Sequence, residues 1–259
     1  MISRLHLFEF GDLEWFPHVL RDAETAFLAG LYRLLPLLRT QWAEKISSAL
    51  TFGEPVEIVD LCSGSGGAMV WIIEDLVKRG YDVRATLTDL YPTPRTLSHA
   101  RLTRLNEPVD ATRVPANLTG VRTCVLTMFS AFHHFRPDAA KAILKDAFDR
   151  HRAICIFESG TGGWLGVAGA LGVPLHVLAL MPFARPFRWP YLFFTYVIPI
   201  VPLFLTWDAI VSNLRIYGPA QMRELTADLR APDYMWEIGS MRLLGLPFAL
   251  PYLIGRPSP

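Results

Sequence analysis

The sequence has little cysteine, no run of basic residues and almost no net charge: its 259 residues include three cysteines and carry a formal charge of +1. A near-neutral chain without a basic cluster has no field that attracts nucleic acid, so we expect no nucleic-acid partner. Cys62, Cys124 and Cys155 lack the paired short spacing of a zinc site or a disulfide framework. We therefore expect buried free thiols in a reducing cytosol, and no metal ion. The first ten residues lack the apolar core of a secretory signal, which also favours a cytoplasmic location.

Charge is also absent from two long apolar runs within residues 160–207. Residues 163–181 and 189–207 contain no Asp, Glu, Lys or Arg, and about 20 apolar residues suffice to cross a bilayer. Pro199 and Pro202 interrupt the second run, and Arg185 and Arg188 stand in the connector, where the positive-inside rule disfavours a hairpin from the cytosol. Three interpretations stay open: the wall of an apolar substrate pocket, peripheral contact with the inner membrane surface, and a membrane span. We favour the first two, which are compatible.

Residues 56–89 have the pattern of a strand, a glycine-rich turn, a helix and a second strand. The glycines allow a ligand to approach the backbone closely, and the helix N-terminus favours an anionic group. Asp89 closes the second strand, where a carboxylate can accept hydrogen bonds from both ribose hydroxyls. The dinucleotide pattern lacks its third glycine, since Met69 stands there, and no Gly-Lys-Ser/Thr ending marks a P-loop. The segment predicts a nucleotide-binding βαβ unit.

Apolar strands alternate with helices along most of the chain. Right-handed crossovers between such strands build a parallel sheet with helices on both faces. We predict helices at 20–38, 42–50, 68–79, 93–106, 137–149, 208–217 and 220–229, and strands at 56–60, 82–88, 108–111, 121–128, 153–158, 235–241 and 249–255. The predicted fold class is α/β, with residues 1–50 as a helical extension or lid. Residues 51–259 form the main domain, which carries the apolar insertion 160–207.

Motifs in this order resemble those of class I S-adenosylmethionine-dependent methyltransferases. The similar segments are Val-Asp-Leu-Cys-Ser-Gly-Ser-Gly (59–66) to the glycine-rich motif, Leu-Thr-Asp (87–89) to the acidic ribose loop, Val-Asp-Ala-Thr (109–112) to the adenine-side motif, and residues 127–135 to the segment after the fourth strand. One departure is Cys62, which stands where the first glycine usually lies. The resemblance covers roughly residues 54–160. It implies a Rossmann-like, doubly wound, seven-stranded sheet that is mostly parallel, with the last strand antiparallel.

The resemblance also implies S-adenosyl-L-methionine as the cofactor, bound by several loops. The implied residues are Gly64 and Gly66 at the methionyl moiety, Asp89 at the ribose, Asp110 and Ala111 at the adenine, and Met128 and Phe129 at the sulfonium. Asp60 would organise the loop, and Ser63 and Leu90 complete the cofactor-binding set. Methyl transfer is an in-line displacement, so the protein contributes chiefly alignment and exclusion of water.

Further candidates flank this set. They are His133, His134 and Asp208 for catalysis, and Trp15, Phe16, Arg215 and Tyr217 for binding the acceptor. The histidines have a pKa suited to a general base, which is needed only if the acceptor keeps its proton; packing or capping is the alternative. The two N-terminal aromatic residues form either a hydrophobic staple or part of a lid. The three residues after the second apolar run either line the acceptor site or only cap, solvate and pair.

The sequence thus predicts S-adenosylmethionine-dependent methyl transfer to a small, hydrophobic acceptor. Two rivals stay open. One is a catalytically silent, membrane-associated nucleotide-binding protein, and the other is a nicotinamide-dependent oxidoreductase, which the incomplete glycine pattern disfavours.

Overall fold

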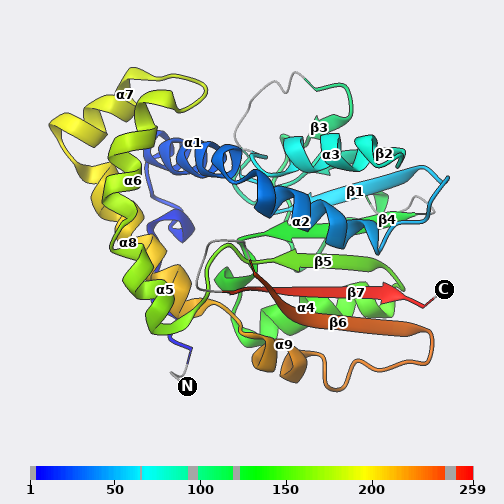
Figure 1. The fold of residues 1–259 in the computed structure, drawn as a ribbon. Coiled ribbons are helices and arrows are strands. Elements are labelled where there is room, and N and C mark those ends of the chain that lie inside the picture. The colour runs from blue at the N-terminus through cyan, green and yellow to red at the C-terminus, as the bar shows by residue number, and fades with distance from the viewer. Residues whose placement is uncertain (1–3, 65, 93–98, 119–122, 243–248, 259) are drawn as a thin grey trace.

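The structure, a computed structural model, describes residues 4–64, 66–92, 99–118, 123–242 and 249–258. Its strands form a seven-stranded sheet in the order β3-β2-β1-β4-β5-β7-β6 (Figure 1). The strands are β1 Val56–Leu61, β2 Val83–Leu87, β3 Leu102–Arg104, β4 Cys124–Phe129, β5 Ala153–Phe157, β6 Tyr234–Arg242 and β7 Ala249–Pro257. Strand β7 runs antiparallel to both of its neighbours, β5 and β6, and all the other strand pairs are parallel. This arrangement confirms the predicted fold class.

Helices cover both faces of the sheet because successive strand residues point to opposite sides. Ile58 of β1 lies in one apolar cluster with residues of α2 (Pro36–Ser47) and α3 (Met69–Lys78). Its neighbour Val59 lies in a second cluster with residues of α4 (Pro137–Asp149) and α9 (Pro219–Leu225). The sheet is therefore doubly wound, with a core on each face.

A third apolar cluster joins helices beyond the carboxyl ends of the parallel strands. It combines residues of α1 with residues of the layer that follows β5. Helix α1 spans His18–Leu34, and the layer consists of α5 Gly163–Ala170, α6 Val173–Leu180, η4 Met181–Phe183, α7 Trp189–Leu192, the π-helical η5 Phe193–Val197 and α8 Ile200–Arg215. Three short turns lie elsewhere in the chain: η1 Phe10–Asp12, η2 Ala116–Leu118 and η3 Phe132–His134. Figure 1 shows α1 beside this layer, at one end of the sheet.

Several predicted boundaries are wrong. The first two helices are α1 and α2 rather than 20–38 and 42–50, because Pro36 cannot continue a helix and begins the second one. The predicted helix 93–106 lies partly outside the described residues, and its last part forms β3, which pairs with β2. No strand forms at 108–111. Strand β3 has only three residues, too few for an alternating pattern in the sequence, and it forms because it pairs with β2.

Asp208 does not begin a helix. Helix α8 starts after Pro199, whose lack of an N–H donor is harmless at that position, and it continues through Asp208 to Arg215. In the part of the chain that the structure describes, no single helix has the length and hydropathy of a membrane span. Two pairs of consecutive helices have the length and hydropathy of a span when taken together, but each pair is bent at its break. Gly163–Ala170 and Val173–Phe183 are bent by 43°, and Trp189–Val197 and Ile200–Arg215 by 83°.

Candidate functional site

The turn after β1 has left-handed backbone at Cys62, Gly64 and Gly66, with φ of 54°, 52° and 75°. Glycine adopts this conformation freely, whereas a cysteine in it is strained. A Cβ atom on Gly66 would lie 2.4 Å from Cδ1 of Leu87, so the turn also packs too closely for a side chain there. The backbone of the turn is therefore exposed to the space in front of it.

Helix α1 packs directly against this turn. A Cβ atom on Gly67 would lie 2.8 Å from the Cα of Ala29, and one on Gly64 would lie 3.2 Å from a methyl group of Thr25. Small residues on both surfaces allow this approach. Helix α1 thus forms one wall of the space in front of the turn.

Asp89 lies just beyond β2 and faces the same turn. Its Oδ2 atom accepts a hydrogen bond from the N–H of Gly64 at 2.7 Å, and its Oδ1 atom accepts one from the N–H of Tyr91 at 2.9 Å. A carboxylate has about four acceptor sites, so both oxygens keep a lone pair for a ligand hydroxyl. Leu90 is half exposed beside it.

Asp60 is buried at the end of β1. Its Oδ1 atom accepts a hydrogen bond from the Thr127 hydroxyl at 2.7 Å. Burial raises the pKa of Asp60 to about 7, and the nearby charge of Asp89 adds to the rise. Ser63 fixes the turn by donating to the Asp60 carbonyl at 2.7 Å. A cation in front of the turn would favour the ionised form of Asp60.

Asp110 shapes its own loop, as aspartates in turns commonly do. Its Oδ1 atom accepts hydrogen bonds from the N–H and the hydroxyl of Thr112, at 2.8 and 2.7 Å. The N–H of Val109 donates to the Asp89 carbonyl at 2.8 Å, which links the two acidic loops. Asp110 and Ala111 therefore lie near Asp89 without any strand at 108–111.

These elements enclose a first cavity of about 370 Å³. Of the predicted cofactor residues, those lining it are Asp60, Ser63, Gly64, Gly66, Asp89, Leu90, Asp110, Ala111 and Phe129. Met128 is not among the lining residues, because alternate residues of β4 face opposite sides and Met128 lies in the second core cluster. Phe129 is held by stacking on Phe157, with ring centroids 5.5 Å apart.

A second cavity of about 330 Å³ adjoins the first. Glu24, Leu28, Ser130 and His134 line both. Helices α1, α5, α6 and α8 supply most of its remaining walls, so the apolar insertion contributes to it. The second cavity is thus a largely apolar space beside the first, which the acidic loops and the glycine turn surround.

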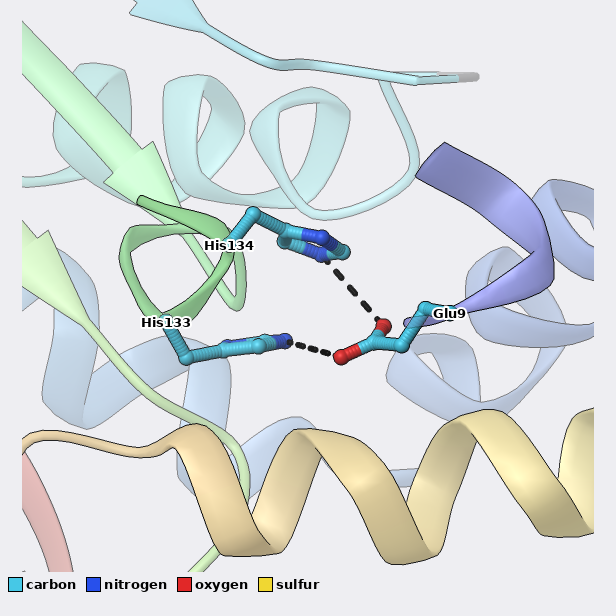
Figure 2. A group of neighbouring side chains, drawn as sticks. All are labelled: Glu9, His133 and His134. Carbon is cyan, nitrogen blue, oxygen red and sulfur yellow. Dashed lines mark ion pairs between the residues drawn. The ribbon is translucent and has the colours of Figure 1, made fainter. Parts of the chain in front are cut away.

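His133 and His134 both line the second cavity, with their rings 4.4 Å apart. The Nδ1 atom of His133 lies 2.8 Å from Glu158, and that of His134 lies 2.6 Å from Asp12. Since an ionised carboxylate only accepts, each Nδ1 carries the proton. The Nε2 atoms face the two oxygens of Glu9 at 3.8 Å (Figure 2).

The electrostatics of this cluster are dominated by carboxylates. Burial opposes the charge of His134, yet Glu9 and Asp12 outweigh it and raise the pKa of His134 to about 9. Burial and then the charges of Asp208 and Glu9 raise the pKa of Glu24 to about 8, and burial also raises the pKa of Asp208 to about 7. The wall between the cavities therefore crowds several carboxyl groups together, and their raised pKa values keep Glu24 largely, and Asp208 partly, protonated at pH 7.

Asp208 and Arg215 of α8 hold the N-terminal segment in place. Asp208 accepts hydrogen bonds from the N–H groups of Phe10 and Gly11, at 2.8 and 3.2 Å. Arg215 is fully buried and pairs with Glu9 at 3.0 Å and with Asp12 at 2.6 Å. The segment that carries two carboxylates is thus fixed by a helix about 200 residues away.

The remaining acceptor-side candidates do not line either cavity. Trp15 is 71% exposed on the surface, while Phe16 is buried and packs on Phe204. Tyr217 is buried against Phe132 and donates to the carbonyl of Phe135 at 2.8 Å. Phe16 and Tyr217 are thus packed in the interior, whereas the exposed Trp15 is not.

Four residues that sequence reasoning missed are prominent in the geometry: Glu9, Glu24, Tyr32 and Glu158. Glu158 directly follows a strand on the edge where ligands bind, so its position carried a signal. Glu9 belongs to an acidic and aromatic stretch, but only the fold brings it to His133. Tyr32 donates to Ser130 at 2.8 Å across the first cavity.

Neither a protein-family model nor a curated protein matches the sequence. Among solved structures, the chain is similar to the plantazolicin methyltransferase BpumL in complex with SAH, with 13% identity over 92% of this chain and 95% of that chain and a TM-score of 0.50. A second is an O-methyltransferase family protein from Burkholderia thailandensis, with 12% identity over 88% of this chain and 58% of that chain and a TM-score of 0.45. A third is the mitomycin 7-O-methyltransferase MmcR, with 14% identity over 85% of this chain and 54% of that chain and a TM-score of 0.44. At its identity, the similarity to BpumL shows the fold alone, and that fold is the class I methyltransferase fold.

Proposed function

We propose that this protein is an S-adenosyl-L-methionine-dependent methyltransferase that acts on a small, hydrophobic acceptor. The observation that carries the proposal is the pair of adjoining cavities. The first is bounded by the glycine turn, Asp89 and Asp110, and the second is largely apolar. The class I methyltransferase fold supports the same activity, since BpumL was solved with SAH.

The residues of the first cavity suit the parts of this cofactor. Asp89 offers lone pairs to two ribose hydroxyls, and Asp110 and Ala111 lie beside it for the adenine. The backbone of Gly64 and Gly66 would border the methionyl moiety. Asp60 would stabilise the positive end of the cofactor, because its pKa near 7 lets a bound cation draw it into the charged form.

Methyl transfer would then take place where the two cavities meet. The acceptor atom forms a bond to the methyl carbon as the carbon–sulfur bond breaks, and the electron pair of that bond stays on sulfur. Such a step needs alignment and exclusion of water more than it needs covalent catalysis. An acceptor that still carries its proton would meet His133 and His134, which line the second cavity; with its pKa near 9, His134 could take that proton only after losing its own.

Calorimetry with S-adenosylhomocysteine and with NADH separates this proposal from its rivals. We expect binding of the first and none of the second. Asp89→Ala should weaken the binding by about 1–3 kcal/mol, since charge-assisted hydrogen bonds are lost. Asp82→Ala, an exposed carboxylate paired with Arg101, is the matched control and should bind normally. NADH binding would support the oxidoreductase, and binding of neither would support a silent scaffold.

Transfer of a labelled methyl group from S-adenosylmethionine to a lipid extract then tests catalysis.

We also propose that the helical layer attaches the protein peripherally to the inner membrane surface from the cytoplasm. Outside the second cavity, this layer exposes many large apolar side chains: Trp164, Leu171, Leu175, Leu178, Phe183, Phe187, Trp189, Phe193, Tyr196, Val197, Ile198, Ile200 and Leu203. Large exposed apolar patches are uncommon on soluble monomers and mark sites that contact a partner or a membrane. Arg185 and Arg188 lie exposed among them, as expected near lipid headgroups.

Co-sedimentation with liposomes that contain anionic lipids tests this attachment. We expect binding by the full chain, and weaker binding after Arg185→Gln. Arg230→Gln, an exposed arginine after α9 and outside the helical layer, should bind as well as the unmodified chain. Absence of binding to every liposome would leave the layer with its role as a cavity wall only.

A further inference from the structure

Glu9, His133 and His134 form a compact group of potential metal ligands at the second cavity. One ligand atom from each lies within 4.8 Å of the others. Figure 2 shows the edges of both imidazole rings directed at the Glu9 carboxylate. The two distances from Nε2 to oxygen are 3.8 Å, too long for hydrogen bonds and close to the separation of two donors on one metal ion.

The opposite ring nitrogens are held by carboxylates. Glu158 accepts from Nδ1 of His133, and Asp12 accepts from Nδ1 of His134. This arrangement fixes each ring and leaves its Nε2 atom turned to Glu9. Histidines that bind metals almost always make such a contact, because it sets the tautomer and strengthens the ligand.

The Nε2 atom of His133 supplies a second, independent observation. It is buried, its residue is 4% exposed, and it has no hydrogen-bond partner. A buried polar atom without a partner is destabilising and uncommon in folded proteins. This atom points at Glu9 from within the second cavity, where an added ligand would satisfy it.

The charge around the group also favours a cation. Glu9, Asp12 and Glu158 meet at the histidines, and the carboxyl groups of Glu24 and Asp208 line the same cavity from α1 and α8. Arg215 contacts Glu9 and Asp12 but leaves the remaining carboxylates without its contact. Buried carboxylates are stable when they are paired or coordinate a metal.

We propose that Glu9, His133 and His134 bind one divalent transition-metal cation, with an open coordination position toward the second cavity. Two imidazoles and one carboxylate are a ligand set that Zn²⁺ accepts, and Co²⁺ can replace it. Donors about 2.0–2.1 Å from a tetrahedral ion lie about 3.4 Å apart, so a small closing movement of the three side chains suffices.

If the protein methylates a small acceptor as proposed, this cation identifies the class of that acceptor. All three ligands line the second cavity, so the open position would take a hydroxyl or phenol oxygen of the bound molecule. Coordination lowers the pKa of such a group. Its proton leaves to solvent, and its oxygen then attacks the methyl carbon.

Titration of the chelator-treated full-length protein with CoCl₂ tests the site through the visible absorption of bound Co²⁺. We expect one equivalent to bind and to be displaced by ZnCl₂. Glu9→Gln and His134→Gln should each weaken the binding at least ten-fold. His151→Gln is the matched control, since His151 pairs with Asp233 on the surface, and it should bind Co²⁺ unchanged.

Thermal unfolding of each variant accompanies the titration, and His134→Gln is the safer substitution because its side chain is 31% exposed. The site is overturned if no Co²⁺ binds up to millimolar concentration, or if a folded His134→Gln variant binds it normally. Binding of S-adenosylhomocysteine, measured on the same samples, tests the methyltransferase proposal separately. If the protein binds Co²⁺ but no S-adenosylhomocysteine, the metal site is supported and the methyltransferase proposal is overturned.

Discussion

The carboxyl edge of the sheet and the outer side of the helical layer α5–α8 are both unusual, because the first buries charged side chains and the second exposes large apolar ones. The edge buries carboxylates, histidines and Arg215, each held by named partners. The outer side of the layer exposes tryptophan, phenylalanine and leucine over a stretch almost without charge. Buried charge is unfavourable unless it is paired, and exposed apolar surface is unfavourable unless another apolar surface covers it.

If this contrast is correct, the largest effect on stability should come from Arg215. We expect Arg215→Met to lower the free energy of unfolding by about 3–5 kcal/mol, because Glu9 would keep a buried charge without its cation. Arg188→Met in the helical layer is the control. Arg188 is 45% exposed, so solvent screens its ion pair; because the Asp22 carboxylate is only 10% exposed, we expect a smaller loss of about 1–2 kcal/mol. Equal losses in urea unfolding would remove the distinction between the regions.

Glycine substitutions should separate the regions next. Gly66→Ala should destabilise the protein by about 1–3 kcal/mol and abolish binding of S-adenosylhomocysteine, since the new methyl group would overlap Leu87. Gly169→Ala in α5 has open space around its Cβ position, and alanine favours helix. We expect that variant to be as stable as the unmodified chain or slightly more so. Calorimetry and thermal unfolding of both variants make the comparison.

The pH dependence of stability should reveal Asp60. Its pKa is about 7 in the folded protein and about 3.8 when unfolded, so the folded state holds the proton more tightly. The stability that this provides is complete below pH 4 and is lost as the pH rises to 7, by about 1.4 kcal/mol per unit. Asp60→Asn should remove that part of the slope. Parallel pH profiles for the two proteins would contradict the assignment.

The smallest effect on stability should be found on the helical layer. Leu175 is 72% exposed, and we expect Leu175→Ser to change the free energy of unfolding by less than about 0.5 kcal/mol. The same variant should bind liposomes more weakly. A large loss of stability would show that the outer side of the layer is covered by protein in the native state.

Some of the site could be predicted because its signals are local. The glycine turn and Asp89 each follow a strand whose apolar pattern is visible in the sequence, and parallel strands bring their carboxyl ends together. The role of Asp208 could not be predicted in this way. It looked like a helix cap beside an apolar run, whereas α8 begins earlier and presents Asp208 to the N-terminal segment.

The strand pattern, the glycine turn and the acidic residues after the strands determined by themselves the fold class and the edge where a ligand would bind. These features act over a few residues, and backbone geometry translates them into structure. Only the tertiary structure decided that Glu9, His133, His134 and Glu158 meet, and that α1 covers the turn. Contacts between distant segments depend on how helices pack and on which buried charges find partners, and neither has a pattern within one stretch of sequence.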